Sequence, residues 1–149
     1  MGFVFRWCTD FSPEDPGLEG DASAQRKILS SNSREVLYED LDQSPEGGWL
    51  WSRWKITLRP PDRWHGEAIG STRGWSGDYQ LRSPSFDRTE LTLRGRRRPA
   101  RLAGRGPTHR QVRSNLAHIW KLFKQALETD FRKSIQKRTG IRTRTPRRA

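Results

Sequence analysis

The sequence predicts a loosely organised α+β chain, with a few short antiparallel strands in residues 49–94, one long C-terminal amphipathic helix over about 109–138, and substantial disorder. Three observations lead to this prediction. Apolar residues recur at steps of three and four in the C-terminal third, which is the helical period. Apolar and polar residues alternate between residues 49 and 59, which is the strand period. Leu, Ile, Val and Phe make only 28 of 149 residues beside a formal net charge of +12, which borders on the composition of disordered chains.

Residues 1–48 are acidic, and we expect them to be mostly loop with weak helix. Prolines, glycines and acids dominate residues 9–22, which favours a loop. Residues 22–43 have weak helical character, since Val36, Leu37 and Leu41 share one helical face and Ser33 can cap a short turn. The Pro-Glu-Gly-Gly sequence at 45–48 ends any helix.

Residues 49–93 form a Trp-rich region in which we predict the strands. Trp49–Arg59 is the clearest candidate, because apolar residues occupy every second position up to the Pro60–Pro61 pair. Four glycines in Gly66–Gly77 indicate turns. Tyr79–Arg82 and Thr89–Leu93 are short strand candidates, and a sheet of so few strands is marginal by itself. Six of the seven tryptophans precede residue 76, which predicts a partial core rather than a well-packed body.

The last third divides into a linker over 94–107, a basic amphipathic helix over 108–139 and a disordered basic tail over 140–149. Thr108 and Gln111 fit a capping box, and Gly140 is a natural helix stop. One helical face is apolar: Val112, Leu116, Ile119, Trp120, Phe123, Leu127, Phe131 and Ile135. The other faces are basic: Arg110, Arg113, Lys121, Lys124, Arg132, Lys133 and Lys137.

The charge is polarised along the chain, and this suggests nucleic-acid binding as one function. Residues 1–93 carry a net charge of −4 and residues 94–149 a net charge of +16. A basic run in the linker is suited to contact phosphates: Arg94, Arg96, Arg97, Arg98, Arg101 and Arg105. The tryptophans lie in the other half of the chain, which argues against a platform of rings stacked on bases and for a partial core.

No arrangement in the sequence predicts an enzyme. His65 stands near Asp62 and Glu67, a trio able in principle to bind a metal or transfer a proton, but a solvated polar loop gives the same pattern. His118 is interpreted as a residue on the face of the helix. Cys8 is the single cysteine, so neither a disulfide within the chain nor a cysteine cluster for zinc is expected. We predict no catalytic residue, no metal site and no cofactor.

The amphipathic helix has two further interpretations. It could lie on an anionic membrane or in the groove of an acidic partner, with Trp120, Phe123 and Leu127 as anchors. A stripe this regular more often packs on the rest of its own chain, and we favour that interpretation. The apolar run of residues 116–123 is interrupted by His118 and Lys121, so no transmembrane segment is expected and an intracellular, soluble protein is the default.

The C-terminal residues Thr139–Pro146 have a feature that is clearest at the level of codons. Gly-Ile-Arg-Thr is encoded by GGG-ATT-CGA-ACC, whose reverse complement, GGTTCGAATCCC, resembles the T-arm of a transfer RNA gene. The resemblance covers about the last ten residues and implies no protein family. It implies a dubious open reading frame that runs antisense into such a gene and need not have been selected for an activity.

The sequence alone therefore assigns no biochemical activity. The alternative is a small basic nucleic-acid-binding protein that uses the run from Arg94 to Arg105 on phosphates. A further alternative is a helix that binds a partner or a membrane surface. The sequence leaves the oligomeric state and any other partners open.

Overall fold

The computed structural model describes residues 1–18, 23–43, 48–71, 74–97 and 109–139. Within these residues, two short helices precede six strands and a long helix. In chain order the elements are α1 (Gly2–Cys8), α2 (Asp15–Leu18), β1 (Gln25–Ser31), β2 (Glu35–Gln43), β3 (Trp49–Arg59), β4 (Arg63–Gly70), β5 (Trp75–Ser85), β6 (Arg88–Arg97) and α3 (His109–Thr139). The strands form one antiparallel sheet in the order β1-β2-β3-β4-β5-β6, so each strand pairs with its neighbour in sequence.

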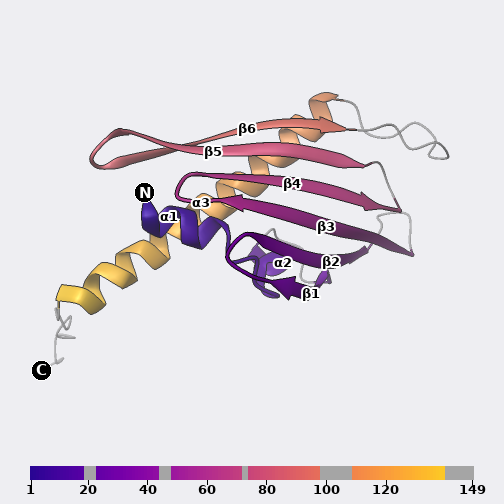
Figure 1. Ribbon diagram of the computed structural model, residues 1–149, viewed down its shortest axis with the longest axis horizontal. Helices are drawn as coiled ribbons and strands as arrows, with labels where there is room; N and C mark the ends of the chain where they lie inside the picture. The colour runs from indigo at the N-terminus through magenta and orange to yellow at the C-terminus, as the bar shows by residue number, and fades with distance from the viewer. Residues whose placement is uncertain (19–22, 44–47, 72–73, 98–108, 140–149) are drawn as a thin grey trace, which may run out of the picture.

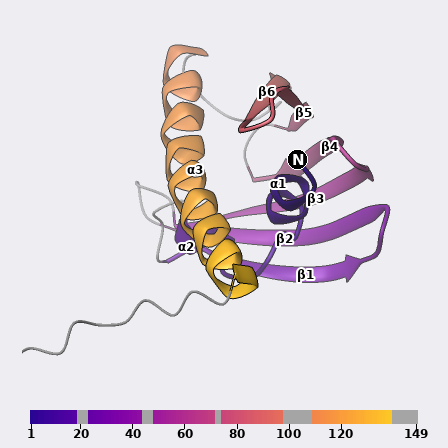
Figure 2. The same cartoon turned by 90° about the vertical axis from the view of Figure 1, so that its left-hand side faces the viewer.

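Helix α3 crosses one face of the sheet diagonally, as two perpendicular views show (Figures 1 and 2). The predicted α+β class and the predicted helix over about 109–138 are confirmed, since α3 spans His109–Thr139. Its apolar stripe is directed at the sheet and at α1, where Trp120 packs against the core and Phe123 contacts Trp7. In the described part of the chain, no helix is both long enough and apolar enough to cross a membrane.

The alternation of side chains along the strands gives the sheet two different faces. The inner face, which α3 covers, carries the buried side chains of Val36, Tyr38, Ile56, Trp64 and Leu81. The outer face carries cross-strand ion pairs, such as Lys55 Nζ to Glu35 Oε2 at 2.9 Å and Arg53 Nη2 to Glu39 Oε1 at 2.6 Å, beside exposed apolar side chains such as Ile69. Such pairs between exposed side chains add little stability, so burial on the inner face holds the sheet to the helices.

Helix α1 connects the sheet to α3. On one side Phe5 is buried with its ring edge against Trp64, the ring centroids 6.1 Å apart. On the other side Phe3 contacts Phe131, and Trp7 Nε1 donates a hydrogen bond of 3.2 Å to Asp130 Oδ2. That bond and a second one from Lys133 hold the pKa of Asp130 below its usual value. These contacts fix where α3 lies over the sheet.

The prediction of only a few short strands is wrong, because the sheet is more extensive and begins at Gln25. Residues 22–43, in which the sequence predicts weak helix, contain β1 and β2 instead. Val36 and Tyr38 are 2% and 4% exposed and alternate with outer-face residues, which is the strand period. Asn32 forms the turn between these strands, since its Oδ1 accepts hydrogen bonds from the N–H groups of Arg34 and Glu35.

Strand β3 confirms the strand predicted over Trp49–Arg59, whereas the turns predicted over Gly66–Gly77 are largely wrong. Gly66 and Gly70 lie in β4, and Gly77 lies in β5. The predicted linker begins too early, because β6 continues to Arg97. The rest of that linker, the helix cap at Thr108 and the predicted disordered tail lie outside the described residues.

The hydrogen bond between Trp7 and Asp130 should stabilise the packing of α1 on α3. Replacing Trp7 by Phe keeps an aromatic ring near Phe123 but removes the N–H donor, so the free energy of unfolding should fall by about 1 kcal/mol. Urea denaturation followed by circular dichroism measures the change. Trp49→Phe is the control, because Trp49 is 54% exposed. An equal decrease in the free energy of unfolding of the two variants would show that the hydrogen bond does not contribute to stability.

Candidate functional site

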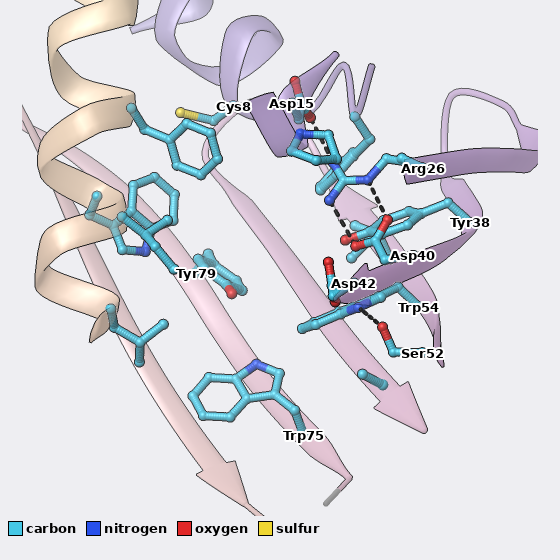
Figure 3. A pocket seen from close by; sticks show the side chains of 18 of the residues that line it. Cys8, Asp15, Arg26, Tyr38, Asp40, Asp42, Ser52, Trp54, Trp75 and Tyr79 are labelled. Carbon is cyan, nitrogen blue, oxygen red and sulfur yellow. Dashed lines mark hydrogen bonds and ion pairs between the residues drawn. The ribbon is translucent and has the colours of Figure 1, made fainter. Parts of the chain in front are cut away.

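A cavity lies between α3 and the inner face of the sheet. Its volume is about 440 Å³, and side chains from α1, α2, α3 and all six strands line it (Figure 3). Cavities that bind small molecules have volumes of about 300–1,000 Å³ and mostly apolar walls with a few polar groups. Size and position therefore make this cavity the candidate site.

A row of three glycines lies on the inner face of the sheet, beside residues that line this cavity. Gly66, Gly77 and Gly95 are paired directly across β4, β5 and β6, in register with Val36 and Ile56 of the neighbouring strands. A Cβ atom on Gly66 would lie 3.2 Å from Ile56 Cδ1, and one on Gly95 would collide with the indole of Trp75. Side chains at these positions would collide with residues already packed there, so the glycines allow Ile56 and Trp75 to pack closely on the sheet.

Aromatic side chains form most of the walls on both sides of the glycine row. On one side Tyr38 stacks on Trp54, with ring centroids 6.1 Å apart and an interplanar angle of 12°. On the other side Trp64 stacks on Tyr79 at 5.0 Å and 7°. The ring centroid of Trp120 of α3 lies 6.0 Å from that of Tyr79. Flat rings arranged in this way suit a ligand with a flat apolar body.

One end of the cavity contains a buried cluster of charges centred on Arg26, whose side chain is only 5% exposed. Its Nε and Nη2 donate to the two carboxylate oxygens of Asp40 at 2.8 and 3.0 Å, and its Nη1 donates to Asp15 Oδ2 at 2.9 Å. Its guanidinium carbon also lies 4.2 Å from the centroid of the Tyr38 ring. These bonds connect α2, β1 and β2 at this end of the cavity.

Burial perturbs the titratable groups near this cluster. It raises the pKa of Asp15 above its usual value, although the charge of Arg26 acts in the opposite direction. Burial, with the carboxylates of Asp10 and Asp15, raises the pKa of the Cys8 thiol to about 12. Cys8 is therefore a neutral thiol near pH 7, and not an activated nucleophile.

The opposite end of the cavity carries hydrogen-bond donors. Trp75 of β5 and Arg97 of β6 are paired in register and both line the cavity. The indole Nε1 of Trp75 is buried and has no hydrogen-bond partner in the described part of the chain. In contrast, the indole N–H of Trp54 donates to Ser52 Oγ at 3.1 Å, and that of Trp7 to Asp130.

The sheet divides the predicted arginine run between its two faces. Arg94 and Arg96 are exposed on the outer face, whereas Arg97 lies on the inner face and lines the cavity. Strand alternation causes this division, so a run that is continuous in sequence is not a continuous surface. Arg98, Arg101 and Arg105 lie outside the described residues.

His65 lies on β4 and not in a polar loop, and its partners differ from the predicted trio. Its Nδ1 is 2.7 Å from Asp78 Oδ1, and its Nε2 is 3.4 Å from Ser76 Oγ and 3.7 Å from Glu67 Oε1. Asp62 pairs with Arg63 instead. Within the described residues, no three His, Cys, Asp or Glu side chains are arranged to hold a metal.

The order Ser76–His65–Asp78 has the connectivity of a hydrolytic triad, but its surroundings do not fit one. Asp78 is 73% exposed, and the group lies on the outer face of paired strands. An oxyanion hole needs free donors directed at one point in a site that excludes water, whereas the N–H groups of paired strands are used in the sheet. The geometry assigns no catalysis to this group.

A comparison of the sequence with protein-family models and with curated proteins finds no match, so the function is inferred from the geometry of the cavity.

Sequence reasoning missed the cavity, although the sequence contains one signal for it. The sequence repeats a Trp-x-Gly pattern at Trp64-His65-Gly66 and at Trp75-Ser76-Gly77. In a strand this pattern places a large ring and a position without a side chain on the same face. Reading Gly66–Gly77 as turns hid this pattern. The pairing of Arg26 with Asp15 and Asp40 leaves no local signal, since it depends on the register of β1 and β2.

The buried charge cluster predicts a pH-dependent loss of stability. Arg26→Met leaves Asp15 and Asp40 buried without a cation, which should cost about 3 kcal/mol of unfolding free energy at pH 7. Burial already raises the folded-state pKa of Asp15, and loss of the opposing charge of Arg26 should raise it further above the unfolded value. Because the folded variant then binds protons more tightly, it should recover stability as the pH falls from 7 towards 4.

Urea denaturation at pH 7 and pH 4.5 measures this recovery. Arg53→Met is the matched control, because its pair with Glu39 is exposed and its loss should change the free energy of unfolding little at either pH. A loss for Arg26→Met that equals the control, or that does not change with pH, would contradict the assignment.

Proposed function

We propose that this protein binds a small molecule with a flat, largely apolar body in the cavity between α3 and the sheet. The observation that carries the proposal is the cavity of about 440 Å³ whose walls are rich in aromatic side chains. A chain with few aliphatic residues gains most by packing its rings together, yet here the rings surround an open space. A space of this size and polarity is suited to a ligand.

We propose that the cavity binds its ligand without catalysing a reaction. The titratable groups of the cavity are not arranged for reaction, because Asp15 and Asp40 bond to Arg26 and the thiol of Cys8 is protonated near pH 7. A general base needs a free lone pair within reach of a substrate proton, and a cysteine nucleophile needs its thiolate. The proposal therefore keeps the expectation that the protein is not an enzyme.

Blocking the cavity from the helix side tests the proposal. A panel of naphthalene probes, 2-methylnaphthalene, 2-naphthoate and 2-naphthylmethylammonium, has flat bodies small enough for the cavity. At about 0.5 kcal/mol per non-hydrogen atom, we expect the best member to bind at one site with a Kd on the order of 50 µM. Ile119→Trp places a larger ring in the cavity and should weaken that binding about tenfold, measured by isothermal titration calorimetry.

Ala117→Trp is the control, because Ala117 is exposed on α3 and does not line the cavity. It should leave the Kd unchanged, and circular dichroism checks that both variants fold. Absence of binding for all three probes would contradict the proposed function, and so would equal weakening by the two substitutions.

A second candidate function is nucleic-acid binding, now centred on α3 as well as on the predicted arginines. Seven cations of α3 are exposed: Arg110, Arg113, Lys121, Lys124, Arg132, Lys133 and Lys137. Arg94 and Arg96 add exposed charge on the outer face of the sheet. The further alternative of a membrane-surface or groove-binding helix is less well supported, because Trp120 and Phe123, two of its three anchors, pack inside the protein.

The salt dependence of RNA binding tests this second candidate. Replacing Lys121, Lys124 and Lys133 by Gln removes three phosphate contacts, which should reduce the slope of log K against log salt concentration by about 2 for a single-stranded RNA. Fluorescence anisotropy of a labelled 20-nucleotide RNA measures the slope. Binding that does not respond to salt, or an unchanged slope in the variant, would contradict the candidate.

A separate proposal concerns the origin of the C-terminal residues. The likeness of Thr139–Pro146 to an antisense reading of a transfer RNA T-arm supports a reading frame that overlaps such a gene. Residues 140–149 lie outside the described residues, so the proposal rests on the sequence alone. Absence of a transfer RNA gene from the opposite strand would overturn it.

A further inference from the structure

The polar side chains that line the cavity differ in whether they have hydrogen-bond partners. Asp15 and Asp40 accept bonds from Arg26, and Asp42, the third carboxylate in the lining, also has an interaction partner. At the other end, the buried N–H of Trp75 has no acceptor among the residues that the structure describes. Because buried donors in proteins are nearly always paired, this N–H marks the place of a missing acceptor.

The indole of Trp75 cannot easily turn away to find a partner elsewhere. Its ring lies along the glycine row, so that a Cβ atom on Gly77 would be 3.0 Å from Nε1 and one on Gly95 would collide with the far edge of the ring. The glycines thus form a flat shelf that fits the indole. Figure 3 shows the nitrogen edge of Trp75 on the side towards Tyr79.

Arg97 supplies a positive charge on the same row of the sheet. Its Cα is paired with that of Trp75, and its side chain lines the cavity. Within the described residues it forms no ion pair, whereas Arg26 at the other end holds two carboxylates. A guanidinium and an indole N–H on adjacent strands can together bind one carboxylate, since its two oxygens accept several hydrogen bonds.

We propose that the ligand of this cavity is an aromatic carboxylic acid, with its carboxylate bound by Trp75 Nε1 and Arg97 and its ring between the aromatic walls. The proposal rests on the proposed function, since it assumes that the cavity binds a small molecule. An amine is disfavoured, because the carboxylates able to receive it already have partners.

The three naphthalene probes test the proposal, because they differ only in the group attached to the ring. Titration calorimetry at pH 7.5 with the full chain should give a Kd for 2-naphthoate about tenfold lower than that for 2-methylnaphthalene. 2-Naphthylmethylammonium should bind more weakly than either. The order of the three affinities reports the polarity of the cavity.

Two pairs of variants locate the carboxylate. Trp75→Phe and Arg97→Gln should each weaken binding of 2-naphthoate about tenfold and change binding of 2-methylnaphthalene less than twofold. Trp49→Phe and Arg96→Gln are the controls, since Trp49 and Arg96 are exposed and neither lines the cavity. Both controls should leave all affinities unchanged.

The outcomes separate this proposal from the proposed function. If 2-methylnaphthalene or the ammonium probe binds as tightly as 2-naphthoate, the carboxylate assignment is wrong while the cavity remains a binding site. Unchanged affinity for 2-naphthoate in both Trp75→Phe and Arg97→Gln also overturns the assignment. If no probe binds, the proposed function itself fails.

Discussion

The absence of side chains at Gly66, Gly77 and Gly95 is the constraint on which the rest of the structure depends. These residues are aligned across three adjacent strands on the inner face of the sheet. Any Cβ atoms there would meet Ile56, the indole of Trp75 or Leu93. The row therefore gives Trp75, which lines the cavity, a flat surface to pack on. Glycine within a strand is locally destabilising, and here that cost permits the close packing of Trp75 on the sheet.

Two other features compensate for an open interior in a chain with few aliphatic side chains. Aromatic rings provide much of the buried area, with stacked pairs such as Trp64–Tyr79 on the sheet and edge contacts such as Trp7–Phe123 between helices. The ion cluster of Arg26, Asp15 and Asp40 joins α2 to the first two strands at one end of the cavity. Because both features lie in the walls of the cavity, they stabilise the fold of the sheet without filling the cavity.

The sequence predicts those parts of the fold that have a strong local period. The long apolar stripe of α3 and the alternation of β3 are of this kind, and both predictions are confirmed. Strands β1 and β2 were missed because the neighbouring Val36, Leu37 and Leu41 also fit a helical face, and only pairing with β3 decides between the periods. Strand β4 and the first residues of β5 were missed because glycine usually marks a turn, whereas the strand predicted over Tyr79–Arg82 lies within β5. The cavity combines residues from every element, so no local pattern specifies it, although the repeated Trp-x-Gly is a partial signal.

The proposed function depends on an open space between α3 and the sheet, and xenon tests for this space most directly because it binds dry apolar cavities without needing polar contacts. In methyl NMR spectra under xenon pressure, the account predicts saturable shifts for the methyl groups that line the cavity, such as those of Ile56, Val112 and Ile119. Exposed Leu29 should not shift in this way. In Gly95→Ala, which forces the Trp75 indole from its place, the shifts should decrease. Xenon shifts spread over surface methyl groups, or unchanged in Gly95→Ala, would contradict the account.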